Sequence, residues 1–131
     1  RAAAPAAQLD AAWTSVIEQL SPSLRRLPLV AGGRSSGARV ACRTAQATGA
    51  IGVLCLAFPL HPPGRPEKTR LGELAAVSAR VLVVQGASDP FGMPPEARGR
   101  EVVVVAGNHS LTGDLDAVRL AVGEWIARLL G

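Results

Sequence analysis

The sequence predicts a doubly wound α/β domain built on a mostly parallel sheet. Three observations lead to this fold class. Short, continuously apolar runs recur along the chain, as is typical of parallel strands that are covered on both faces. Segments with helical periodicity separate most of these runs. The 131 residues suffice for a single domain with its own core, over residues 1–131, and no internal repeat divides them.

The N-terminal third of the chain predicts a helix, a strand and a second helix. The first helix covers residues 2–20, ends at Ser21-Pro22 and is expected to pack on the sheet. A short buried strand follows over residues 27–31. The next helix covers residues 36–48, and small residues on its inner face allow it to lie close to the sheet. These inner residues are Val40, Ala41, Thr44 and Ala45.

The middle of the chain predicts three more strands. They cover residues 50–58, 80–86 and 101–106, and each is almost entirely apolar. The segment 59–68 is rich in proline and therefore predicts an extended loop. A weak helix is expected near residues 70–77.

The last element is a helix over residues 114–130. Asp114 is a candidate N-cap, and Gly131 follows the last helical residue. One face of the helix is apolar and is expected to cover the sheet. This face consists of Leu115, Val118, Val122, Trp125, Ile126 and Leu129.

A glycine-serine turn between the first strand and the second helix matches the nucleophile elbow, G-x-S-x-G. Gly33, Ser35 and Gly37 occupy the fixed positions. In this motif the serine hydroxyl projects above the end of the sheet, and we expect a Cβ atom at either flanking glycine to collide with the close backbone. The backbone N–H of Ser36, at the start of the helix, is a candidate oxyanion donor. A plain strand-to-helix turn is the alternative interpretation.

Two further polar residues follow later strands at the same edge of the sheet. Asp89 follows the strand that ends at residue 86, and His109 follows the strand that ends at residue 106. Because ligands bind at the carboxyl ends of parallel strands, Ser35, Asp89 and His109 are expected to form a catalytic triad. Asp-Pro turn chemistry and a loop histidine bonded to backbone are the simpler alternatives for each residue alone.

Two basic residues are candidates for lining a pocket. Arg34 lies inside the elbow, and His61 lies in the proline-rich loop near Arg65 and Lys68, where it could favour an anionic substrate. For His61 we favour an exposed loop position over this pocket role. Arg34 could equally be solvated or paired with a carboxylate.

The composition argues against several classes of function. The formal charge is +4, but the arginines are scattered and only 3% of residues are aromatic, so nucleic-acid binding is not indicated. No apolar run is long enough to cross a membrane and no signal peptide opens the chain, so we expect a cytoplasmic protein. Cys42 and Cys55 are expected to be buried, reduced thiols, and nothing indicates a metal or cofactor.

Phosphate binding by the glycine-rich turn is a second class of function. Residues 32–37 could cradle a phosphate at the start of a helix. The Walker pattern requires Lys and then Ser or Thr after its last glycine, but Ala38 and Arg39 follow here. This interpretation also leaves Asp89 and His109 without a role.

Four segments together resemble a known group of proteins. Residues 32–37, the His-Pro-Pro-Gly-x-Pro-Glu-Lys run at 61–68, residues 85–92 and residues 108–111 look like bacterial dienelactone-hydrolase-like members of the α/β-hydrolase superfamily. These are grouped with a subunit of an animal histone-acetyltransferase regulatory complex. The resemblance implies a fold of the α/β-hydrolase type, a nucleophile at Ser35, an acid at Asp89 and a base at His109. Members often carry Met or another bulky residue where this chain has Ser36.

The resemblance also implies strands that this chain lacks. A complete α/β-hydrolase has several strands before the elbow and a loop that supplies a second oxyanion N–H. We therefore expect residues 1–131 to be the C-terminal portion of the fold, with an open edge that could pair with a second copy or with the missing half. The predicted reaction is hydrolysis of a small ester-type substrate, and the alternative is a catalytically inactive interaction module.

Overall fold

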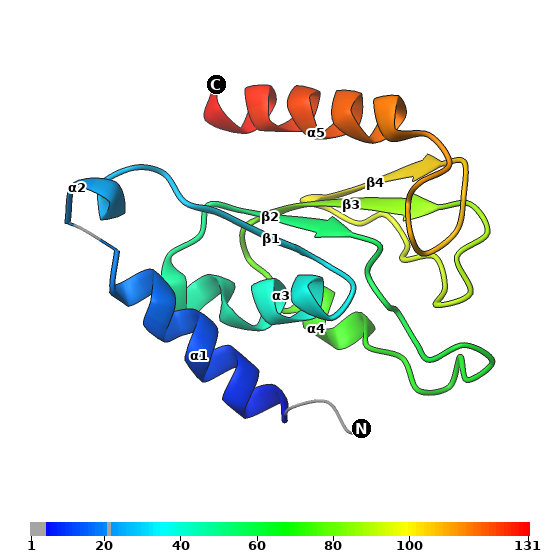
Figure 1. Ribbon diagram of the computed structural model, residues 1–131, viewed down its shortest axis with the longest axis horizontal. Coiled ribbons are helices and arrows are strands. Elements are labelled where there is room, and N and C mark those ends of the chain that lie inside the picture. The colour runs from blue at the N-terminus through cyan, green and yellow to red at the C-terminus, as the bar shows by residue number, and fades with distance from the viewer. Residues whose placement is uncertain (1–4, 21) are drawn as a thin grey trace.

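A computed structural model of the chain describes residues 5–20 and 22–131. Four strands in this part of the chain form one sheet in the order β1-β2-β3-β4, and each neighbouring pair is parallel. Helices α3 and α4 lie on one face of the sheet and α5 lies on the other (Figure 1). The strands are β1 (Val30–Arg34), β2 (Gly52–Leu56), β3 (Arg80–Gly86) and β4 (Arg100–Val105). The predicted fold class is therefore confirmed.

The helices agree with the sequence prediction to different degrees. The second predicted helix has the expected bounds, and the weak helix is shorter than expected. The structure also has a short helix over Pro22–Arg25, for which the sequence gives no helical signal. Residues 2–4 of the first predicted helix, and Ser21, lie outside the described residues. The helices are α1 (Ala6–Glu18), α2 (Pro22–Arg25), α3 (Ser36–Thr48), α4 (Leu71–Ala75) and α5 (Leu115–Leu130).

The first strand begins and ends later than the sequence predicts. The predicted range was 27–31, but β1 pairs with β2 from Val30 to Arg34. An apolar run indicates burial but does not specify which residues pair with the neighbouring strand. In addition, Pro28 has no backbone N–H that could donate a hydrogen bond to β2. The backbone N–H of Ser35 donates to the Leu56 carbonyl at 2.9 Å, so the hydrogen bonds to β2 continue into the elbow.

The sequence predicts that the first helix packs on the sheet, but α1 packs mainly on α3. Trp13 is its one described side chain that packs against the buried core, and Val16 is 60% exposed. Arg43 on α3 forms an ion pair with Asp10 on α1 at 2.9 Å. Since α3 already covers this face of the sheet, α1 forms an outer layer.

The core is divided by the sheet into two apolar clusters. On the α3 side, Ala31, Val53 and Cys55 are buried. On the α5 side, Leu82 and Val84 of β3 are fully buried with Trp125 of α5, whereas their neighbours in β1 and β2 are only partly buried. Because α5 contacts β3 and β4, it leaves the same face of β1 and β2 less covered.

Two predictions for the last helix have different outcomes. Asp114 is the N-cap, since its carboxylate accepts a hydrogen bond from the backbone N–H of Ala117 at 3.0 Å. The prediction that Leu115 lies on the inner face is wrong, because its side chain is 59% exposed. The residues of α5 that pack on the sheet begin at Ala117.

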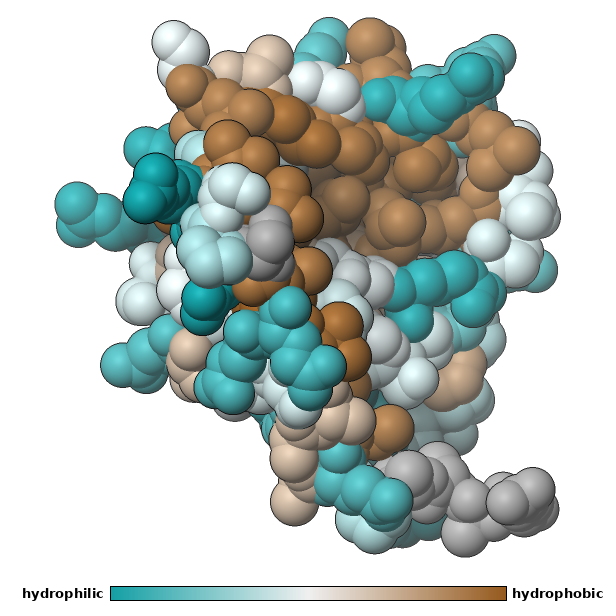
Figure 2. All heavy atoms as spheres, turned by 60° about the vertical axis from the view of Figure 1, so that its left-hand side comes forward, coloured by the Kyte–Doolittle hydropathy of each residue, from teal (hydrophilic) through white to brown (hydrophobic). Residues whose placement is uncertain are grey.

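Apolar side chains gather around a hollow on the side of the molecule where α2 lies (Figure 2). Leu24 of α2, Leu27 before β1 and Ile51 before β2 are 52%, 61% and 41% exposed. These three residues line a groove of about 590 Å³ together with the end of α1. Within the described residues, none of the helices combines the length and the hydropathy that crossing a bilayer requires.

Candidate active site

Ser35 lies at the turn from β1 into α3 with a strained backbone. Its φ and ψ angles are 55° and −118°, a conformation that L-residues rarely adopt. A Cβ atom on Gly33 would overlap the backbone of Gly37, so the turn requires glycine at position 33. The expected collision at Gly37 is wrong, because a Cβ atom there would meet nothing within 4 Å. The tight approach is therefore the fit of Gly33 against the first turn of α3.

Ser35, His109 and Asp89 form a continuous hydrogen-bonded row. The Oγ atom of Ser35 lies 2.8 Å from Nε2 of His109. The opposite ring nitrogen, Nδ1, lies 2.8 Å from Oδ2 of Asp89. A carboxylate only accepts, so Nδ1 carries the proton and Nε2 of the neutral ring is free to accept from the serine. The structure thus brings together the three residues that the sequence places after three different strands.

The carboxylate of Asp89 is held inside a tight turn after β3. Its side chain is 0% exposed. Oδ1 accepts a hydrogen bond from the backbone N–H of Phe91 at 2.8 Å, and the Asp89 N–H donates to the Gly86 carbonyl at 3.1 Å. The Asp-Pro turn chemistry and the contact with His109 therefore coexist at this residue, and the turn aims Oδ2 at the imidazole.

The imidazole of His109 is enclosed on one face by an aromatic ring. The ring centroids of Phe91 and His109 are 4.2 Å apart, with an interplanar angle of 30°. The His109 side chain remains 18% exposed. A Cβ atom on Gly86 would overlap the Asn108 carbonyl. Glycine at the end of β3 therefore lets the loop that carries His109 approach the turn that carries Asp89, residues 86–92, which we call the acid turn.

Ser36 is the first residue of α3. Its N–H is one of the amides that a helix N-terminus leaves without an intrahelical acceptor. The helix dipole adds partial positive charge at this end. This amide follows directly after Ser35, which is the sequence position that the elbow motif assigns to an oxyanion donor.

Arg34 and His61 each contact a loop that follows a strand of the sheet. Arg34 is exposed, and its Nη2 donates to the backbone carbonyl of His109 at 3.2 Å instead of pairing with a carboxylate. His61 is partly buried, which corrects the expected exposed position. Its backbone N–H donates to the Phe91 carbonyl at 3.0 Å, and its ring packs against Gly92. Both residues therefore support the loops that carry Asp89 and His109.

Sequence reasoning missed two residues around this row. Phe91 gave only a weak signal, as an aromatic residue two positions after the acid. Gln85 gave a clearer one, because it is a polar residue in an otherwise apolar buried strand. Its Nε2 lies 3.3 Å from Oδ2 of Asp89.

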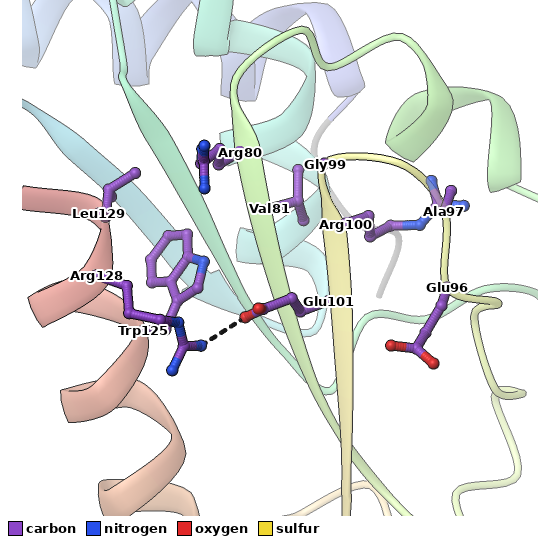
Figure 3. A pocket seen from close by; sticks show the side chains of 10 residues that line it. All are labelled: Arg80, Val81, Glu96, Ala97, Gly99, Arg100, Glu101, Trp125, Arg128 and Leu129. Carbon is purple, nitrogen blue, oxygen red and sulfur yellow. Dashed lines mark hydrogen bonds and ion pairs between the residues drawn. The ribbon is translucent and has the colours of Figure 1, made fainter.

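A separate cavity of about 270 Å³ lies at the opposite end of the sheet (Figure 3). It is lined by Arg80 and Arg100, the first residues of β3 and β4, whereas Ser35, Asp89 and His109 follow the carboxyl ends of strands. Arg128 of α5 points toward Glu101 there and forms an ion pair at 2.8 Å. This cavity is therefore not part of the Ser35 site.

Potential metal ligands do not cluster in the part of the chain that the structure describes, where no three His, Cys, Asp or Glu side chains come together. Cys42 and Cys55 are free, buried thiols, as predicted, with their sulfur atoms 3.6 Å apart. The hydrogen bond with Cys42 and burial together raise the pKa of Cys55.

A parallel sheet with helices on both faces, and a strained serine at the turn after β1, define a domain of the α/β-hydrolase type. Comparison with protein families agrees with this class. The chain belongs to the alpha/beta hydrolase domain family, which it matches over residues 1–114. The narrower resemblance to dienelactone hydrolases and to a histone-acetyltransferase complex subunit stays a prediction.

Two solved structures share the fold. One is the thioesterase domain from the curacin biosynthetic pathway, with 15% identity and a TM-score of 0.64 over 97% of this chain and 72% of that one. The other is an alpha-beta serine hydrolase homologue from Coxiella burnetii, with 19% identity and a TM-score of 0.58 over 91% of this chain and 57% of that one. A comparison with curated protein sequences finds no match. At these identities the two structures show the fold alone.

Proposed function

We propose that this chain is a serine hydrolase that cleaves an ester or a similar acyl bond through an acyl-serine intermediate. The observation that carries the proposal is the row of two 2.8 Å hydrogen bonds from Ser35 through His109 to Asp89. In this row the serine is next to a base, and the base is oriented by a buried carboxylate. Family membership supports hydrolase chemistry in general.

The proposal gives each residue of the row a role. Oγ of Ser35 attacks the substrate carbonyl carbon while Nε2 of His109 takes the hydroxyl proton, and the carbonyl oxygen becomes an oxyanion. The imidazolium then gives that proton to the leaving alkoxide, so that the alcohol departs and the acyl group remains on Ser35. Water repeats the same two steps and releases the acid. Throughout, Asp89 fixes the tautomer and stabilises the imidazolium.

The oxyanion is stabilised at the start of α3. The backbone N–H of Ser36 and the positive end of the helix dipole lie directly after the nucleophile. We assign one donor to this position. Loss of a single oxyanion donor costs on the order of a hundredfold or more in rate, so a second donor would matter greatly for turnover.

We also propose that Arg34 and His61 flank the substrate site. Arg34 lies one residue before the nucleophile with an exposed guanidinium, and His61 packs against the acid turn. This placement favours a substrate whose acyl portion carries negative charge. Comparing hydrolysis of a neutral ester with that of its carboxylate analogue, in wild type and in Arg34→Gln, tests this preference. Equal loss on both substrates would contradict it.

The test of hydrolase function is labelling by a fluorophosphonate, which reacts with activated serines. Intact-protein mass spectrometry should show a single adduct that maps to Ser35. The adduct should disappear in Ser35→Ala and His109→Ala. Ser36→Ala is the matched control, because it removes a neighbouring hydroxyl, keeps the backbone N–H and should label normally. A folded chain without an adduct would contradict the proposal.

A second candidate function is an interaction module without catalytic activity. The less covered face of β1 and β2, the position of β1 at the edge of the sheet and the apolar groove beside α2 favour it. A strand edge and apolar surface of this kind are suited to pairing with another chain or with a second copy. Light scattering over a range of concentrations tests self-association, and a monomer mass at every concentration would exclude the dimer.

A further inference from the structure

Gln85 is a buried polar side chain that the reaction described above does not use. It lies on β3, where Val81, Leu82, Val83 and Val84 precede it, and it is 0% exposed. A buried polar group is costly unless it is hydrogen-bonded, so its presence in an apolar strand needs a physical reason.

The amide nitrogen of Gln85 contacts two backbone carbonyls and the carboxylate of Asp89. Nε2 donates to the Phe58 carbonyl at 2.8 Å, just beyond the end of β2, and to the Gly92 carbonyl at 2.8 Å, at the end of the turn that carries Asp89. It also lies 3.3 Å from Oδ2 of Asp89. The same Oδ2 atom accepts the hydrogen bond from Nδ1 of His109.

The surroundings of the amide determine which end faces the acid. Its three neighbours at Nε2 are two carbonyl oxygens and a carboxylate oxygen, which are all acceptors. The opposite orientation would place Oε1 against three oxygens. In the orientation observed, Oε1 is buried and has no hydrogen-bond partner among the described residues. The NH₂ end is thus placed on the acid turn although the oxygen end is left unsatisfied.

We propose that Gln85 is a positioning residue for Asp89, which holds the carboxylate in line with His109. This inference rests on the proposed hydrolase function. Two short hydrogen bonds tie the acid turn to the end of β2, and the positive end of the amide dipole faces Oδ2. Since the Asp89 side chain is 0% exposed, water cannot supply this donor. Without Gln85, Oδ2 can turn away from Nδ1.

The experiment compares Gln85→Met with a matched core variant, Val83→Ala. Methionine is also unbranched but donates no hydrogen bond. Val83 lies on the same strand, is 0% exposed and belongs to the apolar cluster on the α3 side, so its truncation loosens the core without touching Asp89. Both variants are measured for fluorophosphonate labelling rate, for kcat and KM on a p-nitrophenyl ester, and for the NMR signal of the His109 Nδ1–H proton. The signal is assigned by its absence from His109→Ala.

We expect Gln85→Met to lower kcat and the labelling rate by roughly tenfold, with little change in KM. The variant loses the two hydrogen bonds to the Phe58 and Gly92 carbonyls and the amide dipole that faces Oδ2 of Asp89. Its Nδ1–H signal should shift or broaden. Val83→Ala should lower the Tm but keep the wild-type signal and labelling rate. A Gln85→Met variant with wild-type kcat and signal would overturn the inference, as would equal changes in both variants.

The two proposals fail in different ways. If the wild-type protein is folded but is not labelled, the hydrolase proposal fails, and the His109 proton signal in Gln85→Met still decides whether Gln85 positions Asp89. If labelling is lost in Ser35→Ala but not in Gln85→Met, only the inference about Gln85 fails.

A second variant covers the case in which Gln85→Met does not fold. Gln85→Glu keeps the length and shape of the side chain. The introduced carboxyl donates one hydrogen bond when neutral and none when ionised, and its charge then repels Asp89. The ratio of variant to wild-type labelling rate should therefore fall from about pH 6 to about pH 8. A constant ratio near one, or loss of fold in both Gln85 variants while Val83→Ala folds, would overturn the inference.

Discussion

The ring of Phe91 lies against the imidazole of His109, with 4.2 Å between the ring centroids. The backbone N–H of the same residue donates to Oδ1 of Asp89 at 2.8 Å. One residue therefore contacts both His109 and Asp89, through its side chain and its main chain respectively. A substitution at position 91 separates the two contacts, because it removes the ring and keeps the amide.

Replacing Phe91 by leucine should lower kcat by up to about tenfold, since an aromatic pair contributes about 0.5–1.5 kcal/mol beyond its buried area. The loss arises from greater freedom of the His109 ring, while the N–H bond to Asp89 remains. Steady-state kinetics on a p-nitrophenyl ester measure the change, and Phe91→Tyr is the control that keeps the ring. A leucine variant as active as wild type would show that the stacking does not orient the base.

Gly33 and Gly37 both flank Ser35 but should differ sharply in their tolerance of a side chain. Gly33→Ala would place a Cβ atom within the backbone of Gly37, and we expect it to lower the free energy of unfolding by more than about 2 kcal/mol. Gly37→Ala meets nothing within 4 Å and lies in the first turn of α3, so it should be neutral or stabilising by up to about 1 kcal/mol. Urea unfolding of the two variants measures the difference. Equal destabilisation would contradict this account of the elbow.

The sequence predicted those parts of the site that depend on strand order. Ser35, Asp89 and His109 each follow a strand, and parallel strands end at one edge, so their proximity follows from topology. The sequence could not predict that Gly37 is unhindered or that His61 packs on the acid turn. The first fact depends on the direction in which a Cα–H bond points, and the second depends on how two loops meet. Neither feature produces a periodic pattern in the sequence. The first helix was misplaced for a similar reason, because an apolar stripe does not specify whether a helix or a sheet receives it.

The ion-pair network around Glu73 predicts how stability depends on pH. Burial opposes ionisation of Glu73, but hydrogen bonds and charge from Arg39 at 2.8 Å and Arg43 at 3.3 Å outweigh it, so the pKa of Glu73 is lowered. A carboxyl whose pKa is lower in the folded state stabilises the fold above its unfolded pKa and loses this contribution as the pH falls through the folded pKa. Wild-type stability should therefore decrease below about pH 4.5.

Glu73→Gln tests this dependence, because it removes the charge and keeps the shape. It should lower the free energy of unfolding by about 1 kcal/mol at neutral pH, since the side chain is partly exposed and solvent screens the pairs. The difference from wild type should shrink in acid as the wild-type carboxyl becomes protonated. Thermal unfolding followed by circular dichroism at a series of pH values measures both effects. A difference that is constant with pH would show that the ion pairs contribute nothing.

Cys42 and Cys55 should be unreactive in the folded protein. Both thiols are buried, and their sulfur atoms lie 3.6 Å apart across the contact between α3 and β2. The hydrogen bond with the neighbouring thiol of Cys42 and burial raise the pKa of Cys55, so little of the reactive thiolate forms. Ellman's reagent should therefore titrate no thiol under native conditions and two in denaturant. Two thiols that react rapidly in the native state would mean that α3 separates from the sheet on the timescale of the assay.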